Sequence, residues 1–329
     1  MSGAMGVFGQ RLRRGSRAVI LTAVQSRAAN ERLPLLGRCR SLAAVTVLEI
    51  IRRSSEFLEK KGVESPRLNI ELLLAHALNM PRLKLYLNFE RVLNEAELNT
   101  VRAMVVRRAA REPLQHITGS TSFCGLEMKC SRAALVPRPE TELVAERAWQ
   151  FLSTLNSQLS TALDLGTGTG CIAIAIAKKA PAITVHAIDV SAEALALARE
   201  NAAVHQVSDR ITFHEGDAFA ALPSPMQFDL IVSNPPYIAA EEIATLSPEV
   251  RDFDPRLALD GGADGLDFYR RLATEAGAFL KPGGKLMLEF GDGQETALGK
   301  LFFDEKWIVE EIVADYSSRP RILIARRGE

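Results

Sequence analysis

Two short motifs in this 329-residue chain combine residue types that suit chemistry on a bound ligand. One is DLGTGTG at residues 164–170, and the other is NPPY at residues 234–237. Glycines let a backbone approach a ligand closely, and a helix that begins after them offers unpaired N–H groups. Consecutive prolines remove backbone donors and fix the chain, which leaves carbonyl groups and the preceding asparagine to contact a ligand. Both motifs are therefore candidate parts of a binding site.

The glycine motif favours one class of cofactor. Its spacing is GxGxG, whereas a dinucleotide fingerprint, GxGxxG, would need a glycine at the position of Cys171. Asp164, which precedes the glycines, would also sit poorly beside a pyrophosphate. The pattern indicates S-adenosylmethionine, which carries a positive charge and an amino group. A nucleotide site and a tight structural turn are the alternatives.

Two acidic residues after later strands extend this interpretation. Asp189 is placed to accept hydrogen bonds from both ribose hydroxyls of an adenosyl group. The alternative is a cap for the next helix, a role that Ser191 fills better. Asp217, with Ala218 and Phe219 beside it, is expected to receive the adenine amino group and to cover the ring. The alternative for Asp217 is an acid in a surface loop.

The NPPY motif suits recognition of a planar –NH2 group. Such a group needs two hydrogen-bond acceptors, which the side-chain oxygen of Asn234 and the carbonyl of Pro235 can supply. Pro236 stiffens the segment, and Tyr237 is expected to add an aromatic wall. The alternative is a rigid turn without chemistry.

After residue 161 the chain alternates short apolar runs with segments of helical spacing. The runs expected to form strands cover residues 162–165, 184–189, 211–213, 228–233, 285–290, 308–313 and 321–325. Helices are expected at residues 171–180, 192–205 and 265–280. This alternation predicts an α/β fold with a mainly parallel sheet, which binds ligands at the carboxyl ends of its strands. Both motifs follow such strands.

The segments before residue 161 have other patterns. Apolar residues recur at helical spacing from residue 42 to about residue 111, which predicts a small all-helical module. Residues 112–139 hold short extended runs with Gly119 and Gly125 as turn residues, which predict a hairpin-like connector. Residues 1–40 contain eight arginines and one acidic residue. This leader is interpreted as a poorly ordered basic segment, the product of an early start codon, a transit peptide or a nucleic-acid-binding arm.

Composition argues against several classes of protein. With 47% hydrophobic and 24% charged residues, the chain is expected to be globular. Its central apolar stretch, residues 171–177, is far shorter than the roughly 18 to 20 residues of a membrane span. Four cysteines without CxxC spacing and five scattered histidines indicate neither a disulfide framework nor a metal site. The net charge is zero, so the seven excess positive charges of residues 1–40 leave seven excess negative charges elsewhere, which disfavours broad nucleic-acid binding.

The order of the motifs resembles that of a known group of enzymes. DLGTGTG, AID, GDAF and FDLIVSNPPYI follow one another as in Rossmann-like methyltransferases that modify planar nitrogen atoms, among them DNA adenine methyltransferases. Three further segments narrow the resemblance: REPLQHITGSTSFCGLEMKCSRAALVPRPETE, PEVRDFDPRLALDGGADGLDFYR and LKPGGKLMLEFGDGQ. Together with the helical module they are similar to the protein-(glutamine-N5) methyltransferases of peptide chain release factors, the HemK/PrmC family. The resemblance covers about residues 42–326.

The resemblance implies a fold and an activity. The fold is a Rossmann-like class I methyltransferase domain with a mainly parallel seven-stranded sheet at residues 140–329, preceded by a helical substrate-recognition domain at residues 41–111. The activity is transfer of a methyl group from S-adenosylmethionine to the side-chain N5 of the glutamine in the Gly-Gly-Gln motif of a release factor. The implied partner is that factor, in the cytoplasm, or in mitochondria if residues 1–40 are a transit peptide. Neither direct nucleic-acid binding, a membrane nor a metal is expected.

The resemblance also assigns roles to residues. The methionine part of the cofactor is lined by Gly166, Thr167, Gly168, Thr169 and Gly170. Asp189 holds the ribose, and residues 234–237 bind the glutamine amide. Arg138 and Glu140, within residues 137–142, lie beside the entry for cofactor and substrate, for which a solvated ion pair is the alternative. Residues 248–265 form part of the floor and rim of the crevice, where residues 260–262 also fit a simple turn.

Two rival functions are kept beside this one. An adenine-N6 DNA or RNA methyltransferase would bring the same kind of –NH2 group to NPPY, but it must extract the base and usually adds a basic recognition surface. A cofactor-binding module without catalysis would act through its helical domain as an interaction protein. Asn234 and Tyr237, which such a module would not need, argue against it.

Overall fold

The structure is a computed structural model that describes residues 45–155, 160–223 and 226–328. The chain divides into two compact units, one up to Arg111 and one from Glu112 onward. The arginine-rich segment at residues 1–40 lies outside the described residues. Within the described part, no helix is both long enough and apolar enough to cross a membrane.

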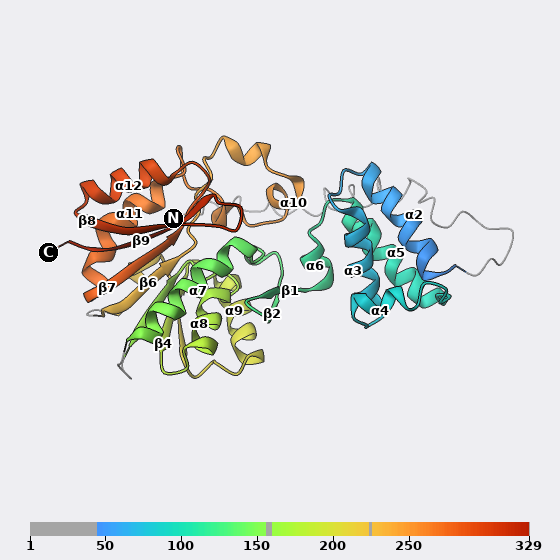
Figure 1. Cartoon of the computed structure of the whole chain (residues 1–329), viewed down its shortest axis with the longest axis horizontal. Helices are drawn as coiled ribbons and strands as arrows, with labels where there is room; N and C mark the ends of the chain where they lie inside the picture. Colours follow the sequence, from blue (N-terminus) through green and yellow to red (C-terminus); the bar gives the residue numbers. More distant parts are fainter. Residues whose placement is uncertain (1–44, 156–159, 224–225, 329) are drawn as a thin grey trace, which may run out of the picture. The chain divides into compact units, whose positions relative to one another are not determined.

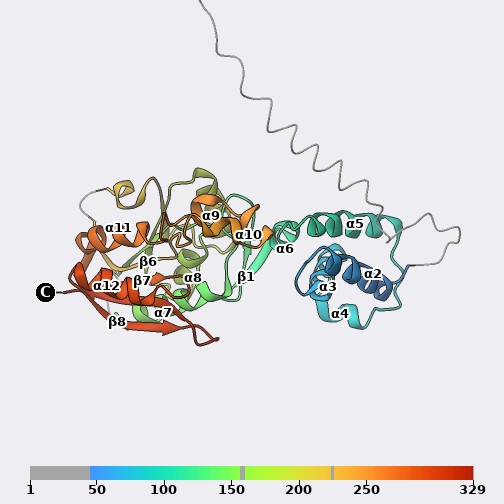
Figure 2. The ribbon, with the colours of Figure 1, turned by 90° about the horizontal axis from the view of Figure 1, so that it is seen from above.

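The first unit is helical, as predicted (Figure 2). Its helices are α2 (Val47–Lys60), α3 (Pro66–Ala77), α4 (Arg82–Tyr86) and α5 (Glu95–Ala109). Side-chain caps define two helix starts, since Thr46 accepts a hydrogen bond from the Glu49 N–H at 3.3 Å and Asn94 forms a capping box with Glu97. The buried residues of α2 recur at the predicted helical spacing, and they are Val47, Ile50, Ile51, Ser54 and Leu58.

The second unit begins with a short helix, α6 (Leu114–Thr118), and a hairpin of β1 (Ser120–Phe123) and β2 (Leu126–Lys129). The hairpin agrees with the predicted pattern, whereas α6 was expected to be extended. Cys124 and Gly125 form its turn with positive φ angles of 52° and 76°. Asn201 holds the hairpin by accepting from the Lys129 N–H at 2.8 Å and donating to the Lys129 carbonyl at 3.2 Å. The hairpin is therefore packed into this unit.

A seven-stranded sheet forms the centre of the second unit, in the order β5-β4-β3-β6-β7-β9-β8. Its strands are β3 (Thr161–Leu165), β4 (Thr184–Asp189), β5 (Ile211–Glu215), β6 (Phe228–Ser233), β7 (Leu280–Glu289), β8 (Trp307–Ala314) and β9 (Pro320–Arg327). All pairs are parallel except those made by β9, which confirms the predicted mainly parallel sheet. Strand order reverses between β3 and β6, the place where open sheets of this kind bind ligands.

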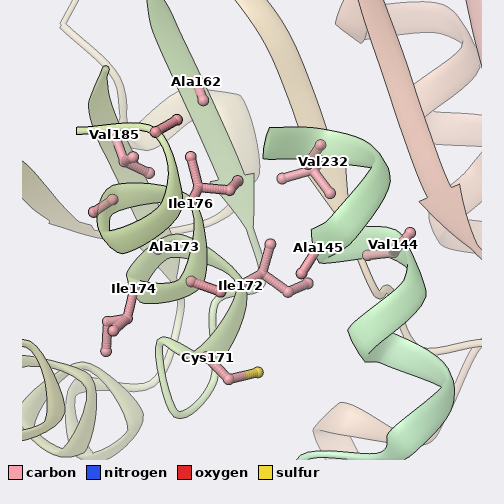
Figure 3. Close-up of a cluster of buried hydrophobic side chains, with 14 of the residues drawn as sticks. Val144, Ala145, Ala162, Cys171, Ile172, Ala173, Ile174, Ile176, Val185 and Val232 are labelled. Atoms are coloured by element: carbon pink, nitrogen blue, oxygen red, sulfur yellow. The ribbon is translucent and has the colours of Figure 1, made fainter. Parts of the chain in front are cut away.

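Helices cover both faces of this sheet (Figure 1). One face carries α7 (Pro139–Thr154), α8 (Cys171–Lys179) and α9 (Ala192–Val204), and the other carries α11 (Asp267–Glu275) and α12 (Glu295–Asp304). Figure 3 shows α8 packed through Ile172 and Ile176 beside β3, with Val144 and Ala145 of α7 nearby. Short turns of helix complete the unit: η2 (Ala218–Ala221), η3 (Glu242–Thr245), α10 (Pro248–Arg251), η4 (Arg256–Ala258) and η5 (Ala276–Phe279).

The prediction for residues 265–290 was wrong in its boundaries. The expected helix at 265–280 is split into α11 and η5, and β7 begins at Leu280 instead of residue 285. Residues 282–284 are Pro-Gly-Gly, which indicates a loop from sequence alone. They form instead an irregular part of the strand, where the register with β6 shifts between Phe228 and Leu230.

Candidate active site

A cavity of about 450 Å³ opens at the carboxyl ends of β3, β4 and β6. Predicted site residues that line it are Arg138, Gly166, Thr167, Gly168, Thr169, Asp189, Asp217, Ala218, Asn234, Pro235 and Pro236. Predicted residues outside the lining are Glu140, Gly170, Phe219 and Tyr237. The structure thus brings both motifs to one cavity and leaves four of the expected residues away from its wall.

The glycine loop forms a wall made mainly of backbone. Gly166, Gly168 and Gly170 have φ angles of 73°, 55° and 80°, a region that strongly favours glycine. The N–H groups of Gly166 and Thr167 both donate to the Ile188 carbonyl at 2.9 Å, which ties the loop to the end of β4. Gly170 caps α8, where an added Cβ would lie 3.0 Å from the Cβ of Ala198. Gly170 therefore permits close packing of α8 on α9.

A buried carboxyl lies beneath this loop. Asp164 is fully buried, and its Oδ2 accepts from the Thr167 hydroxyl at 2.7 Å and from the Ala173 N–H at 3.1 Å. Its Oδ1 has no hydrogen-bond partner among the residues described. Burial raises the pKa of Asp164 to about 7, since it disfavours the charged form. A cationic ligand above the loop would favour the ionised carboxylate.

Asp189 joins the end of β4 to the glycine loop. Its Oδ2 accepts from the Gly168 N–H at 2.8 Å, and its Oδ1 accepts from the Ser191 N–H at 2.9 Å. Helix α9 is capped by Ser191, whose hydroxyl accepts from the Ala194 N–H at 3.2 Å. The alternative role of Asp189 as the helix cap is thus taken by Ser191. Each carboxylate oxygen keeps a lone pair for a hydroxyl in the cavity.

The segment after β5 differs from its predicted arrangement. Asp217 and Ala218 line the cavity, but Phe219 is 4% exposed and stacks on Phe279, with ring centroids 4.5 Å apart. The Asp217 carboxylate pairs with Arg271 of α11, which also lines the cavity. The Phe219 ring is therefore part of the core, and the aromatic side chain at the cavity is Phe268.

The NPPY segment follows β6, the neighbour of β3, and its residues Asn234, Pro235 and Pro236 form a second wall of the cavity. The Asn234 Nδ2 donates to the Thr141 hydroxyl of α7 at 3.1 Å. No described residue donates a hydrogen bond to the Asn234 Oδ1. Tyr237 packs against the core, and burial raises the pKa of its hydroxyl to about 12. Its ring packs against the hydrophobic core and does not line the cavity.

The backbone of this segment is held by a neighbouring glycine loop. A Cβ at Gly261 would lie 2.8 Å from the Pro236 carbonyl oxygen, and one at Gly265 would clash with that of Tyr237. Gln294 donates to the Tyr237 carbonyl at 3.0 Å and accepts from a backbone N–H of its own turn at 2.9 Å. Residues 260–265 are therefore packed against NPPY and are more than an isolated turn.

Comparison with known proteins gives one consistent result. Residues 49–119 match the PrmC N-terminal domain, and residues 147–248 match the methyltransferase small domain. The release factor glutamine methyltransferase of Geobacter sulfurreducens is 46% identical over 255 residues, which cover 77% of this chain and 87% of that protein. That of Chlorobaculum tepidum is 43% identical over 286 residues, covering 84% and 95%. The chain belongs to the release factor glutamine methyltransferase family.

A solved structure gives a further match. It is a protein-(glutamine-N5) methyltransferase (release factor-specific) from Alicyclobacillus acidocaldarius, 29% identical, covering 59% of this chain and 95% of that one, with a TM-score of 0.36.

Membership of this methyltransferase family confirms the predicted cofactor, S-adenosylmethionine. The cavity suits this cofactor, because the glycine loop presents backbone to the ligand. An oxygen of Asp164 that has no hydrogen-bond partner among the described residues lies beneath the loop. Asp189 and Asp217 line the cavity, as do two further acids, Glu193 and Asp260. Among the described residues no group of three or more His, Cys, Asp or Glu side chains could hold a metal ion.

Arg138 does not pair with Glu140, the partner that the ion-pair alternative assumed. Its guanidinium pairs with Asp254 at 2.6 Å, and the Asp254 side chain is only 1% exposed. Glu140 is exposed and does not line the cavity. Burial raises the pKa of Asp254 to about 6, although Arg138 and the Val136 N–H counteract it. In this methyltransferase the pair ties the start of α7 to residues 252–255 at the cavity rim.

Three residues near the cavity in this family member were missed as functional candidates. Thr141 was noted only as part of its motif, whereas Glu289 and Gln294 were quoted in LEFGDGQ without a role. Glu289 is 2% exposed at the end of β7, and burial raises its pKa to about 7. A signal was present, since an acid that ends a buried apolar strand is unusual.

Proposed function

We propose that this chain transfers a methyl group from S-adenosylmethionine to the side-chain nitrogen N5 of a glutamine in a peptide chain release factor. The observation that carries the proposal is the orientation of Asn234. Its NH2 group is bound to Thr141, which leaves its carbonyl oxygen for a ligand in the cavity. Pro235, the next residue, has no N–H that could compete with an incoming –NH2 group.

Positioning supplies most of the catalysis in this proposal. An amide nitrogen is a poor nucleophile because its lone pair is delocalised into the carbonyl group. The Asn234 Oδ1 and the Pro235 carbonyl accept the two amide hydrogens, aim the nitrogen, and stabilise the positive charge that develops on it. S-adenosylmethionine, when bound, supplies an electrophilic methyl group. The nitrogen loses a proton after transfer, so no strong base is required.

The acceptor is a single glutamine in a loop of small residues, which the family resemblance identifies as Gly-Gly-Gln. The direct test incubates the full chain, S-adenosylmethionine and a purified bacterial release factor, and then measures the mass of the factor. We expect one added methyl group, and none when the loop glutamine is replaced by alanine. A methyl group added to the alanine factor, or to adenine of DNA instead, would disprove the assignment.

We assign recognition of the release factor to the helical unit, which matches the PrmC N-terminal domain. Leu83 and Leu87 at α4 are 74% and 85% exposed, so they are available for a partner. Replacing both by serine is expected to raise KM for the factor roughly tenfold, about 1.4 kcal/mol, while kcat is kept. Steady-state kinetics with varied factor concentration tests this, and an unchanged KM would remove α4 from the contact.

We place the chain in the cytoplasm, because the relatives named above are bacterial proteins. Mitochondria are the alternative if residues 1–40 are a transit peptide. A fluorescent reporter fused to residues 1–40 separates the two, because entry into mitochondria would overturn the cytoplasmic assignment.

A further inference from the structure

Asn201 connects the glycine loop to the β1–β2 hairpin. It lies on α9, and its side chain is completely buried. The Asn201 Oδ1 accepts from the Lys129 N–H at 2.8 Å. Its Nδ2 donates to the Lys129 carbonyl at 3.2 Å and to the Thr169 carbonyl at 3.0 Å. The oxygen and both hydrogens of this amide are therefore engaged, and one of its partners belongs to the glycine loop.

These partners fix the orientation of the Asn201 amide. All three are main-chain groups, of which an N–H can only donate and a carbonyl can only accept. A rotated amide would place its NH2 against the Lys129 N–H and its oxygen against two carbonyls. Buried groups left unpaired in this way lower stability, so one orientation is strongly preferred. Asn201 thus links the hairpin to the loop in a single geometry.

The start of α8 leaves the Thr169 carbonyl available for this bond. The helix is capped by Gly170, so the Thr169 carbonyl lies just outside its hydrogen-bond pattern. The Ala173 N–H, four residues later, donates to the Asp164 carboxylate at 3.1 Å and not to this carbonyl. Asn201 therefore supplies the donor that the Thr169 carbonyl does not find in its own helix.

Thr169 is the residue of the glycine loop that this bond holds in place. It lines the cavity and is 2% exposed, and its hydroxyl oxygen has no hydrogen-bond partner among the described residues. A buried hydroxyl of this kind in a cavity wall indicates a contact with a ligand. Because a hydroxyl can both donate and accept, it suits the methionine part of the cofactor, which carries a carboxylate and an ammonium group.

We propose that Asn201 is a positioning residue for the cofactor: by holding the Thr169 carbonyl from α9, it keeps the Thr169 hydroxyl directed at the methionine part of S-adenosylmethionine. The inference rests on the proposed function only for its cofactor. Without this bond the Thr169 carbonyl must turn toward another donor, which moves the hydroxyl with it. An aspartate at position 201 would keep the acceptor for Lys129 but would have no hydrogens for the two carbonyls.

The test is a double-mutant cycle on cofactor affinity. Calorimetry measures the Kd of S-adenosylmethionine for the full-length chain without release factor, so the result does not depend on which acceptor is methylated. In Asn201→Asp the Kd should rise about tenfold, the equivalent of about 1.4 kcal/mol. Thr169→Val removes the hydroxyl and nearly keeps the shape. In that background Asn201→Asp should raise the Kd by only about threefold or less, because residues that act through one another are not additive.

His205→Ala is the matched control for loosening the hairpin. His205 follows α9, and its Nε2 donates to the Glu127 carbonyl of the hairpin at 2.9 Å, without a contact to Thr169. This variant should keep the Kd of the wild type. If Asn201→Asp does not fold, Asn201→Ser, which is neutral and smaller, completes the same cycle.

Three results would overturn the inference. One is an unchanged Kd in a folded Asn201 variant. Another is an equal rise with and without the Thr169 hydroxyl, which would show that Asn201 does not act through Thr169. The third is an equal rise in His205→Ala, which would show that the position of the hairpin alone sets the affinity.

Discussion

The two walls of the cavity are built in different ways. The glycine loop at residues 166–170 is shaped by backbone: three positive φ angles and N–H bonds to the Ile188 carbonyl and Asp189. The NPPY wall is held by side chains from other elements. Thr141 comes from α7 and Gln294 from the turn before α12. The cofactor wall is thus local in the chain, and the substrate wall is assembled from distant parts.

This difference indicates how each wall should respond to substitution. A loop whose shape is set by glycine conformations depends on few partners, so its variants should change affinity for the cofactor. A wall held by side chains from distant elements depends on each of them, so its variants should change methyl transfer while the cofactor still binds. The following substitutions test that division, from the largest expected effect to the smallest.

Asn234→Ala should separate the two walls most clearly. It removes the carbonyl oxygen that we assign to the substrate amide, so methylation should fall by roughly 10² to 10³. Affinity for S-adenosylmethionine, measured by calorimetry, should change little. Asn99→Ala, at an exposed position of α5, is the control. Equal losses in cofactor binding and methylation would end the distinction between the walls.

Glu289→Gln should change how stability depends on pH. Burial raises the folded pKa of Glu289 from 4.5 to about 7, so its contribution is present below pH 4.5 and is lost as pH rises through 7. The glutamine variant lacks this loss. Between pH 4 and pH 8 its free energy of unfolding should therefore rise by on the order of 3 kcal/mol relative to that of the wild type.

Denaturant unfolding at both pH values measures the effect. The charged or titratable groups that face Glu289 are Glu140, Arg138, Arg321, Tyr237 and Tyr269. They are unchanged in the variant, as are Asp164 and Asp254, whose raised pKa values act in the same direction. Parallel pH profiles for the variant and the wild type would show that Glu289 titrates normally.

Asp189→Ala should weaken cofactor binding by about 1.5–3 kcal/mol, the range for hydrogen bonds to a charged group. The loss includes the bonds to the Gly168 and Ser191 N–H groups, which shape the loop. Calorimetry with S-adenosylmethionine measures it, with Asp209→Ala, an exposed aspartate, as the control. Unchanged affinity would remove Asp189 from the site.

Gln294→Ala should have the smallest effect. It leaves the Tyr237 carbonyl and one backbone N–H of the turn without their partner, at a position that is only partly buried. We expect a loss of about 1 kcal/mol in the free energy of unfolding, with unchanged cofactor affinity. Lys300→Ala, on the exposed face of α12, is the comparison. A tenfold loss of cofactor affinity would show that the two walls are not independent.

Sequence alone determined the parts that depend on neighbouring residues. The glycine spacing, the strand before it and the acid at the end of β4 are all local, and they predicted the sheet, the cofactor and its backbone wall. The same local reasoning failed where the backbone departs from its usual preference, as at residues 282–284, which read as a loop and lie within β7. It also placed Phe219 at the cavity, because a sequence gives no direction for that ring.

Only the tertiary structure decided the partners of the chemical groups. Asn234 and Thr141 are 93 positions apart, and Arg138 and Asp254 are 116 apart. Such pairs exist because β6 lies beside β7 and because α7 packs over their ends. Hydrogen bonds act over about 3 Å, so they depend on which elements become neighbours in the fold. For that reason the sequence could identify Asn234 as a candidate amide ligand, while its hydrogen bond to Thr141 became visible only in three dimensions.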